Sequence, residues 1–107
     1  MEKITLNITG VGSSDRVFAA VSKVTGMSHS KIISSSRLWQ IVEARTISII
    51  SFNRLGLVDE KIALLINRAR PTVCKSRKVG ERLLKDSKTF KEKFQKVQTL
   101  LTNQQHG

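Results

Sequence analysis

Residues 59–84 read Asp-Glu-Lys-Ile-Ala-Leu-Leu-Ile-Asn-Arg-Ala-Arg-Pro-Thr-Val-Cys-Lys-Ser-Arg-Lys-Val-Gly-Glu-Arg-Leu-Leu, and this stretch decides the fold. It predicts a short helix, a tight basic turn and a second helix. Asp59 can cap the first helix, because its carboxylate can accept a free backbone N–H. Pro71, the only proline of the chain, suits the first position of the second helix, where its missing N–H costs nothing. Residues 67–70 then form a turn close to helix-turn-helix length.

The second helix of this pair has an apolar side and a basic side. At about 100° per residue, the apolar side carries Val73, Ser76, Gly80, Leu83 and Leu84. The opposite side carries Lys75, Lys78 and Arg82, and the helix is entered through Arg68 and Arg70. A helix that packs inward through apolar residues and presents cations outward is what reading the major groove of DNA requires. The alternative is a solvated basic face on an ordinary helix pair.

The charge of the chain is strongly positive and unevenly distributed. Its 107 residues include 19 Lys and Arg but only 8 Asp and Glu, for a net charge of +11. After residue 60 there are 12 of these cations and 3 of these acids. This balance favours a polyanionic partner and places its contact in the C-terminal half. The length predicts a single domain.

The apolar pattern predicts an all-α fold, a compact bundle of about six helices. Besides the pair described above, helices are expected over residues 15–26, about 30–34, 37–55 and 86–101. The helix over 37–55 is apolar around most of its circumference, so we expect it at the centre of the bundle. Gly26 and Gly56 are expected to end the helices that precede them.

These elements divide the chain into three parts. Residues 1–14 are expected to form a flexible N-terminal arm, in which Ile4, Leu6 and Ile8 alternate with polar residues as in a strand. Residues 15–101 form the helical domain. Residues 102–107 are expected to be a frayed tail.

Three motifs resemble the C-terminal helix-turn-helix domain of the bacterial replication initiator DnaA, of the TrpR-like superfamily. Residues 37–47, Arg-Leu-Trp-Gln-Ile-Val-Glu-Ala-Arg-Thr-Ile, are similar to the family's Arg-x-x-Glu-Val-Val-x-Ala-Arg-Gln-Ile. Residues 62–73, Ile-Ala-Leu-Leu-Ile-Asn-Arg-Ala-Arg-Pro-Thr-Val, are similar to Ile-Gly-x-x-Phe-Asn/Gly-Arg-Asp-His-Ser/Thr-Thr-Val. Residues 86–90, Asp-Ser-Lys-Thr-Phe, are similar to the Asp-Pro-x-x-Phe that begins the family's last helix. The resemblance covers roughly residues 17–101 and implies a divergent member without the family's ATPase module.

The resemblance implies double-stranded DNA as the partner and a role in replication initiation or its regulation. It implies that Arg45 enters the minor groove, although its stem can instead lie along the core edge. Of the residues that read the major groove in the family, Thr72 is retained, with Arg68 at the preceding arginine. The chain differs where it has Ala69 for the family's aspartate and Arg70 for its histidine. Arg70 can still contact guanine with two hydrogen bonds or bind phosphate.

Two further sets of residues bear on the interface. Lys75 and Lys78 are expected to contact phosphates, or else to be solvated. Leu38 and Trp39 stand where the family has cations. Trp39 is expected to be buried against the first helix rather than to stack on a base.

The sequence does not indicate an enzyme. It has no paired carboxylates and no Ser/His/Asp set, so we expect no catalytic residues, no cofactor and no small-molecule substrate. Cys74 is the only cysteine, which fits a reducing cytoplasm, and His29 and His106 are too isolated for a metal site. No apolar run is long enough to cross a membrane. We therefore expect a bacterial cytoplasmic protein associated with the nucleoid.

Two other functions stay open at this point. In one, the chain is a protein-interaction module whose last helix docks on another protein and whose basic face meets an acidic partner. In the other, it binds RNA, although the scarcity of aromatic residues argues against stacking on single strands.

Overall fold

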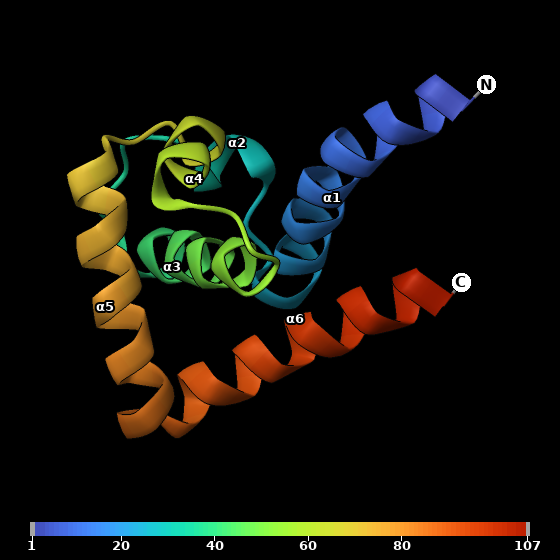
Figure 1. The fold of residues 1–107 in the computed structure, drawn as a ribbon. Helices are drawn as coiled ribbons and strands as arrows, with labels where there is room; N and C mark the ends of the chain where they lie inside the picture. The colour runs from blue at the N-terminus through green and yellow to red at the C-terminus, as the bar shows by residue number, and fades with distance from the viewer. Residues whose placement is uncertain (1, 107) are drawn as a thin grey trace.

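The structure, a computed structural model, describes residues 2–106 and the side chains of residues 14–102. The described residues form six helices and no strand. In chain order these are α1 (Glu2–Thr25), α2 (His29–Ile32), α3 (Trp39–Arg54), α4 (Asp59–Ile66), α5 (Arg70–Asp86) and α6 (Lys88–His106). Figure 1 shows α3 in the middle of the molecule, between α5 on one side and α1 on the other. The all-α prediction with about six helices is confirmed.

The central position predicted for α3 is also confirmed. This helix contacts each of the other five, and Ile47, Ile50 and Phe52 are fully buried. Two serines of α3 are buried as well, and their hydroxyl groups have hydrogen-bond partners. The hydroxyls of Ser48 and Ser51 each donate to the backbone carbonyl four residues earlier, at 2.9 and 2.8 Å. Polar groups in the core are thus paired within the helix itself.

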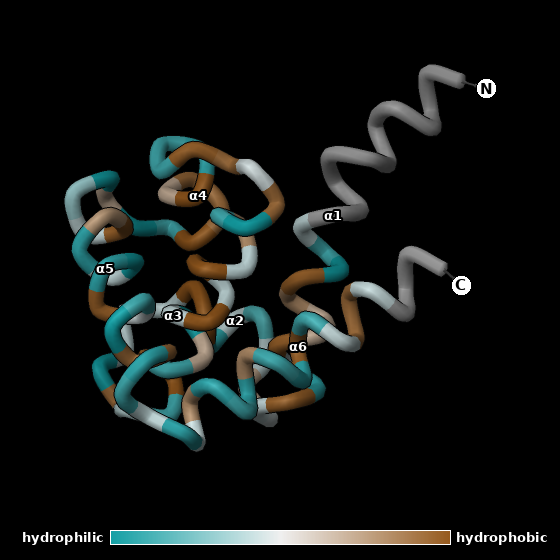
Figure 2. The backbone as a smooth tube through the Cα atoms, turned by 60° about the horizontal axis from the view of Figure 1, so that its bottom comes forward, coloured by the Kyte–Doolittle hydropathy of each residue, from teal (hydrophilic) through white to brown (hydrophobic). Residues whose placement is uncertain are grey.

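The remaining helices pack on α3 through one side each. Figure 2 shows hydrophilic and hydrophobic residues alternating along α5 and α6, as expected for helices that are half in contact with the core. The core side of α6 follows the spacing read from the sequence, because its buried residues are Phe90, Phe94, Val97 and Leu101. They join the same hydrophobic cluster as Val17, Phe18 and Val21 of α1.

Helix ends depend on residues that can adopt positive φ. Gly26 and Gly56 follow α1 and α3 with φ of +79° and +94°, as predicted. Asn67 follows α4 with φ of +64°, a conformation that asparagine tolerates better than most residues. Ser28 caps α2 by accepting a hydrogen bond from the Lys31 backbone N–H.

Several boundaries differ from those predicted. α1 begins at Glu2, so the first helix starts earlier than the predicted residue 15, and residues 4–8, whose alternation is strand-like, lie within it. A lone strand has no partner for its backbone groups, whereas a helix pairs them internally. α5 begins at Arg70, so Pro71 occupies the second helical position, where its missing N–H is equally harmless. The side chains of most of the predicted frayed tail, 102–107, lie outside the described residues.

α5 crosses α3 at Gly80. A Cβ atom placed on this buried glycine would overlap with Ile50 Cδ1 and would lie 2.8 Å from Thr46 Cγ2. Since any side chain here would push the helices apart, the glycine sets how closely α5 approaches the central helix.

Replacing Gly80 with alanine should therefore lower stability. Alanine favours helix by up to about 1 kcal/mol, but overpacking costs about 1–3 kcal/mol, so we expect a net loss of about 1–2 kcal/mol in urea unfolding. Ile50→Val removes the overlapping methyl group, and the Gly80→Ala change should cost less in that background. A Gly80→Ala variant as stable as the wild type would contradict this packing.

Candidate nucleic-acid interface

The helix pair predicted from residues 59–84 is present. α4 and α5 are joined by residues 67–69, and the Arg68 backbone N–H donates to the Ala63 carbonyl at 3.0 Å to close the turn. Ile62 and Ile66 of α4 and Val73 of α5 are fully buried, so both helices are anchored in the common core. The pair is therefore a rigid unit whose outer surface is formed by α5.

The outer surface of α5 is basic. Lys75, Lys78 and Arg82 are exposed there, and Arg70 and Thr72 are exposed in the first turn, one on each flank. None of these four cations forms a hydrogen bond or an ion pair with any residue whose side chain the structure describes. From residue 70 to residue 80 the sequence contains no acid. We call these five residues the α5 basic face.

The acids nearest to this face are held on one flank of α5 by arginines. Asp59 accepts two hydrogen bonds from Arg77, with Nε–Oδ1 at 3.0 Å and Nη2–Oδ2 at 2.8 Å. Glu81 accepts two from Arg54 of α3, at 2.6 and 3.0 Å. The hydrogen bonds from Arg77 lower the pKa of Asp59, and those from Arg54 lower the pKa of Glu81. The two pairs fix the rotation of α5 and remove the acids from its outer side.

The predicted cap of α4 is thus wrong. The residue at the N-cap is Val58, which makes no side-chain cap bond, and Asp59 is the first residue of the helix. Two charge-assisted hydrogen bonds to a guanidinium are stronger than a single bond to a backbone N–H, so the carboxylate is used to join α4 to α5.

Arg45 is a core residue. Its side chain is 7% exposed, and its Nε and Nη2 donate to the carbonyl oxygens of Ile32 and Ser34, both at 2.7 Å. Burial, and then the charge of Arg68, lower its pKa. The minor-groove contact that the resemblance implies for Arg45 finds no support in this arrangement, which matches the alternative of a buried stem.

Arg68 joins the turn of the helix pair to the loop before α3. Its Nη2 donates to the carbonyl oxygen of Ser34, the atom that Arg45 also contacts, and its Nη1 donates to the Asn67 carbonyl. Arg68 is half-buried. Of the six residues predicted for DNA contact, Lys75 and Lys78 are exposed on the outer side of α5, and Arg70 and Thr72 are exposed in its first turn, on opposite flanks at about 100° per residue. Arg68 is half-buried in the preceding turn, and Arg45 is buried.

Sequence reasoning missed the residues just before and at the start of α3. Trp39 is 52% exposed and Leu38 is 65% exposed, so the predicted burial of Trp39 against α1 is wrong. Within the first turn of α3 the core buries Ile41, which is 7% exposed, whereas Trp39 lies about 200° away around the helix and faces solvent. The apolar pair that follows the Ser34-Ser35-Ser36 break and Arg37 was the available signal.

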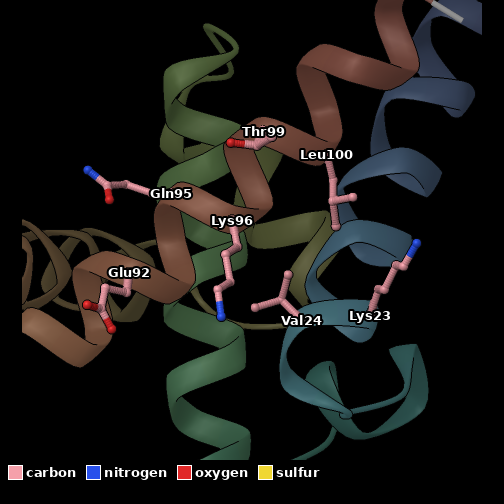
Figure 3. Close-up of a pocket in the computed structure, with 7 residues that line it drawn as sticks. All are labelled: Lys23, Val24, Glu92, Gln95, Lys96, Thr99 and Leu100. Carbon is pink, nitrogen blue, oxygen red and sulfur yellow. The ribbon is translucent and has the colours of Figure 1, made fainter.

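An open groove of about 790 Å³ lies elsewhere, between α1 and α6. Figure 3 shows Lys96 and Leu100 of α6 and Val24 of α1 directed into the space between the two helices. The lining offers two lysines, Glu92 and Thr99 but no histidine, cysteine or serine. In the described part of the chain no three His, Cys, Asp or Glu residues are grouped to hold a metal, and no helix there has the length and apolarity to span a membrane.

Comparison with known proteins adds no relative to this picture. No protein-family model matches the chain, and no curated protein matches it. The likeness to the DnaA domain accordingly depends on the three motifs themselves.

The Asp59–Arg77 pair should make stability depend on pH. Because the folded state lowers the pKa of Asp59, the pair stabilises the fold above the ordinary aspartate pKa of about 4, and this stabilisation is lost as pH falls through the lowered value. Asp59→Asn should cost about 1–2 kcal/mol in urea unfolding at pH 7 and less near pH 2, because more of the carboxylate is protonated there. The exposed neighbour provides the control, since Glu60→Gln should change stability little at either pH. Equal losses for Asp59→Asn at both pH values would show that the carboxylate charge is not what stabilises the pair.

Proposed function

We propose that this domain binds double-stranded DNA by placing the α5 basic face in the major groove. The observation that carries the proposal is the exposed set of unpaired cations on a helix whose other sides are fixed by the core and by two ion pairs. The major groove, about 12 Å wide, admits a helix of this kind.

The positions of the cations suit a duplex. Lys75 and Arg82 are seven residues apart, so they lie roughly 10 Å from each other along the same side of the helix. That length spans neighbouring phosphates of one strand. We assign Lys75 and Lys78 to phosphate contacts, which supply affinity without reading sequence.

The N-terminus of α5 is the end best suited to approach the bases. It has no acid in its first turn, and the free N–H groups of a helix start favour a phosphate. Arg70 is exposed there and can give two hydrogen bonds to guanine, while Thr72 can reach a phosphate or a base edge. With Ala69 and Arg70 at the family's aspartate and histidine positions, the site preferred by this chain would differ from the family's replication-origin box. A role in replication or its regulation, and association with the nucleoid, follow from the resemblance alone and are part of the proposal.

Salt dependence of duplex binding tests the proposal. Each phosphate contact contributes about −0.9 to the slope of log K against log salt concentration. We expect Lys75→Gln/Lys78→Gln to weaken binding by about tenfold or more at 0.1 M salt and to make the slope shallower by roughly 1.8.

A matched control comes from α6. Lys91→Gln/Lys96→Gln removes the same charge from two exposed lysines on another helix, and it should leave the slope nearly unchanged. If the two double variants behave alike, the charge of the whole domain and not the α5 basic face drives binding. A slope near zero for the wild type would reject DNA binding, and stronger competition by an RNA duplex of equal length would point to RNA instead.

A further inference from the structure

Two large apolar side chains lie together at the surface before α3. Leu38 is 65% exposed and Trp39, the first residue of α3, is 52% exposed. Arg37, which precedes them, is exposed as well. Single exposed apolar residues are common on protein surfaces, but two adjacent ones of this size next to a basic surface suggest a contact with a partner.

The loop that carries this pair is fastened to the turn of the helix pair. The Ser34 carbonyl accepts hydrogen bonds from both Arg45 and Arg68. Further along the loop, the Ser36 N–H donates to the Ser34 hydroxyl at 3.3 Å, and the Leu38 N–H donates to the Ser36 hydroxyl at 3.2 Å. In Figure 1 the connection from α2 to α3 passes beside the N-terminal half of α5, in agreement with the Arg68–Ser34 bond. The position of Leu38 is therefore set relative to the residues that precede α5.

The crossing of α3 and α5 shows on which side of α5 the pair lies. α3 contacts Gly80 of α5 through Thr46 and Ile50. The C-terminal end of α3 lies at one flank of α5, where Arg54 pairs with Glu81. The N-terminal end of α3 must emerge at the opposite flank. Trp39 precedes Thr46 by seven residues, roughly 10 Å along the helix, which is enough to clear the width of α5.

That opposite flank of α5 is free of acids. At about 100° per residue it carries Thr72 and Val79, and Val79 is 41% exposed. On this geometry Leu38 and Trp39 lie toward the flank of α5 that carries Thr72 and Val79, both of which are exposed. A second copy of this basic chain would bring like charges together along the same surface, whereas a duplex offers phosphates beside apolar sugar and base surfaces.

We propose that Leu38 and Trp39 contact deoxyribose and base edges of the duplex whose groove receives α5. This inference rests on the proposed function and adds a second, uncharged contact to it. Apolar side chains are used in this way by proteins that press on sugars or wedge between base steps. Arg45 and Arg68, which donate to the Ser34 carbonyl, act as positioning residues. They hold the loop before α3 against the turn between α4 and α5, and they are not part of the exposed surface formed by Leu38 and Trp39.

The single tryptophan makes the proposal directly measurable. Trp39 is the only tryptophan of the chain, so intrinsic fluorescence reports on this residue alone. Titration with an unlabelled duplex should quench it, with a midpoint equal to that found from the anisotropy of a labelled duplex. Trp39→Ala and Leu38→Ser should each weaken binding about tenfold, and Trp39→Phe should retain most of the affinity.

The salt slope separates this contact from the phosphate contacts. Because no charge is removed, Leu38→Ser should leave the slope of log K against log salt concentration unchanged, unlike Lys75→Gln. The control is Leu55→Ser, at the other end of α3, where the leucine is 42% exposed; it should bind as the wild type does. Far-UV circular dichroism and thermal unfolding confirm that each variant is folded before binding is compared.

The outcomes separate the apolar contact from the proposed binding of double-stranded DNA on which it rests. If duplex binding shows the expected salt slope but Trp39 fluorescence does not change and Leu38→Ser binds like Leu55→Ser, the apolar contact is overturned and the DNA-binding proposal stands. A changed salt slope in Leu38→Ser also overturns the apolar contact, because the substitution would then act by moving the cations of the α5 basic face away from the phosphates. If no duplex binds at any salt concentration, both proposals fail together.

Discussion

The close approach of α5 to α3 at Gly80 is the constraint on which the surface of this domain depends. A side chain at this position would meet Thr46 and Ile50, and the separation of the two helices would increase. With these helices in contact, Arg54 of α3 can reach Glu81 of α5. Asp59 of α4 pairs with Arg77 of α5. These pairs define the rotation of α5 about its own axis, and that rotation places Lys75, Lys78 and Arg82 toward solvent.

Four arginines and the lysines of α5 have different tasks in this arrangement. Arg45, Arg54, Arg68 and Arg77 donate to backbone carbonyls or carboxylates inside the domain. Their planar guanidinium groups can make two directed bonds at once, which suits positioning. The lysines of α5 have flexible stems and remain exposed, which suits diffuse contact with phosphates. A high net charge alone would not have distinguished the two roles, because several of the cations that produce it are already paired within the fold.

The sequence predicts most of the fold for simple physical reasons. Apolar spacing identifies the buried sides of α3, α5 and α6, and Gly26 and Gly56 identify two helix ends, because these features depend on neighbours along the chain. The partners of charged side chains depend on neighbours in space, so the Asp59–Arg77 pair was missed and a cap was predicted in its place. Arg45 was assigned to DNA by resemblance, although its carbonyl partners, at the end of α2 and in the loop that follows, are eleven or more residues away along the chain. Trp39 was predicted to be buried because large aromatic residues usually are, but in the first turn of α3 it is Ile41 that faces the core, and Trp39 lies on the opposite side of the helix. Lys75 and Lys78, which are exposed together on the outer side of α5, are the part of the predicted site that follows from helical periodicity within a single element.

The central claim is that one surface of the domain, formed by the turn, the outer side of α5 and the loop before α3, receives duplex DNA. The most direct measurement is a titration of the isotopically labelled chain with duplex DNA, followed by backbone amide NMR shifts. The largest changes should fall on residues 34–39 and 67–79, with the amides of residues 88–101 in α6 nearly unchanged. Shifts concentrated on α6, or spread evenly over all helices, would contradict the account.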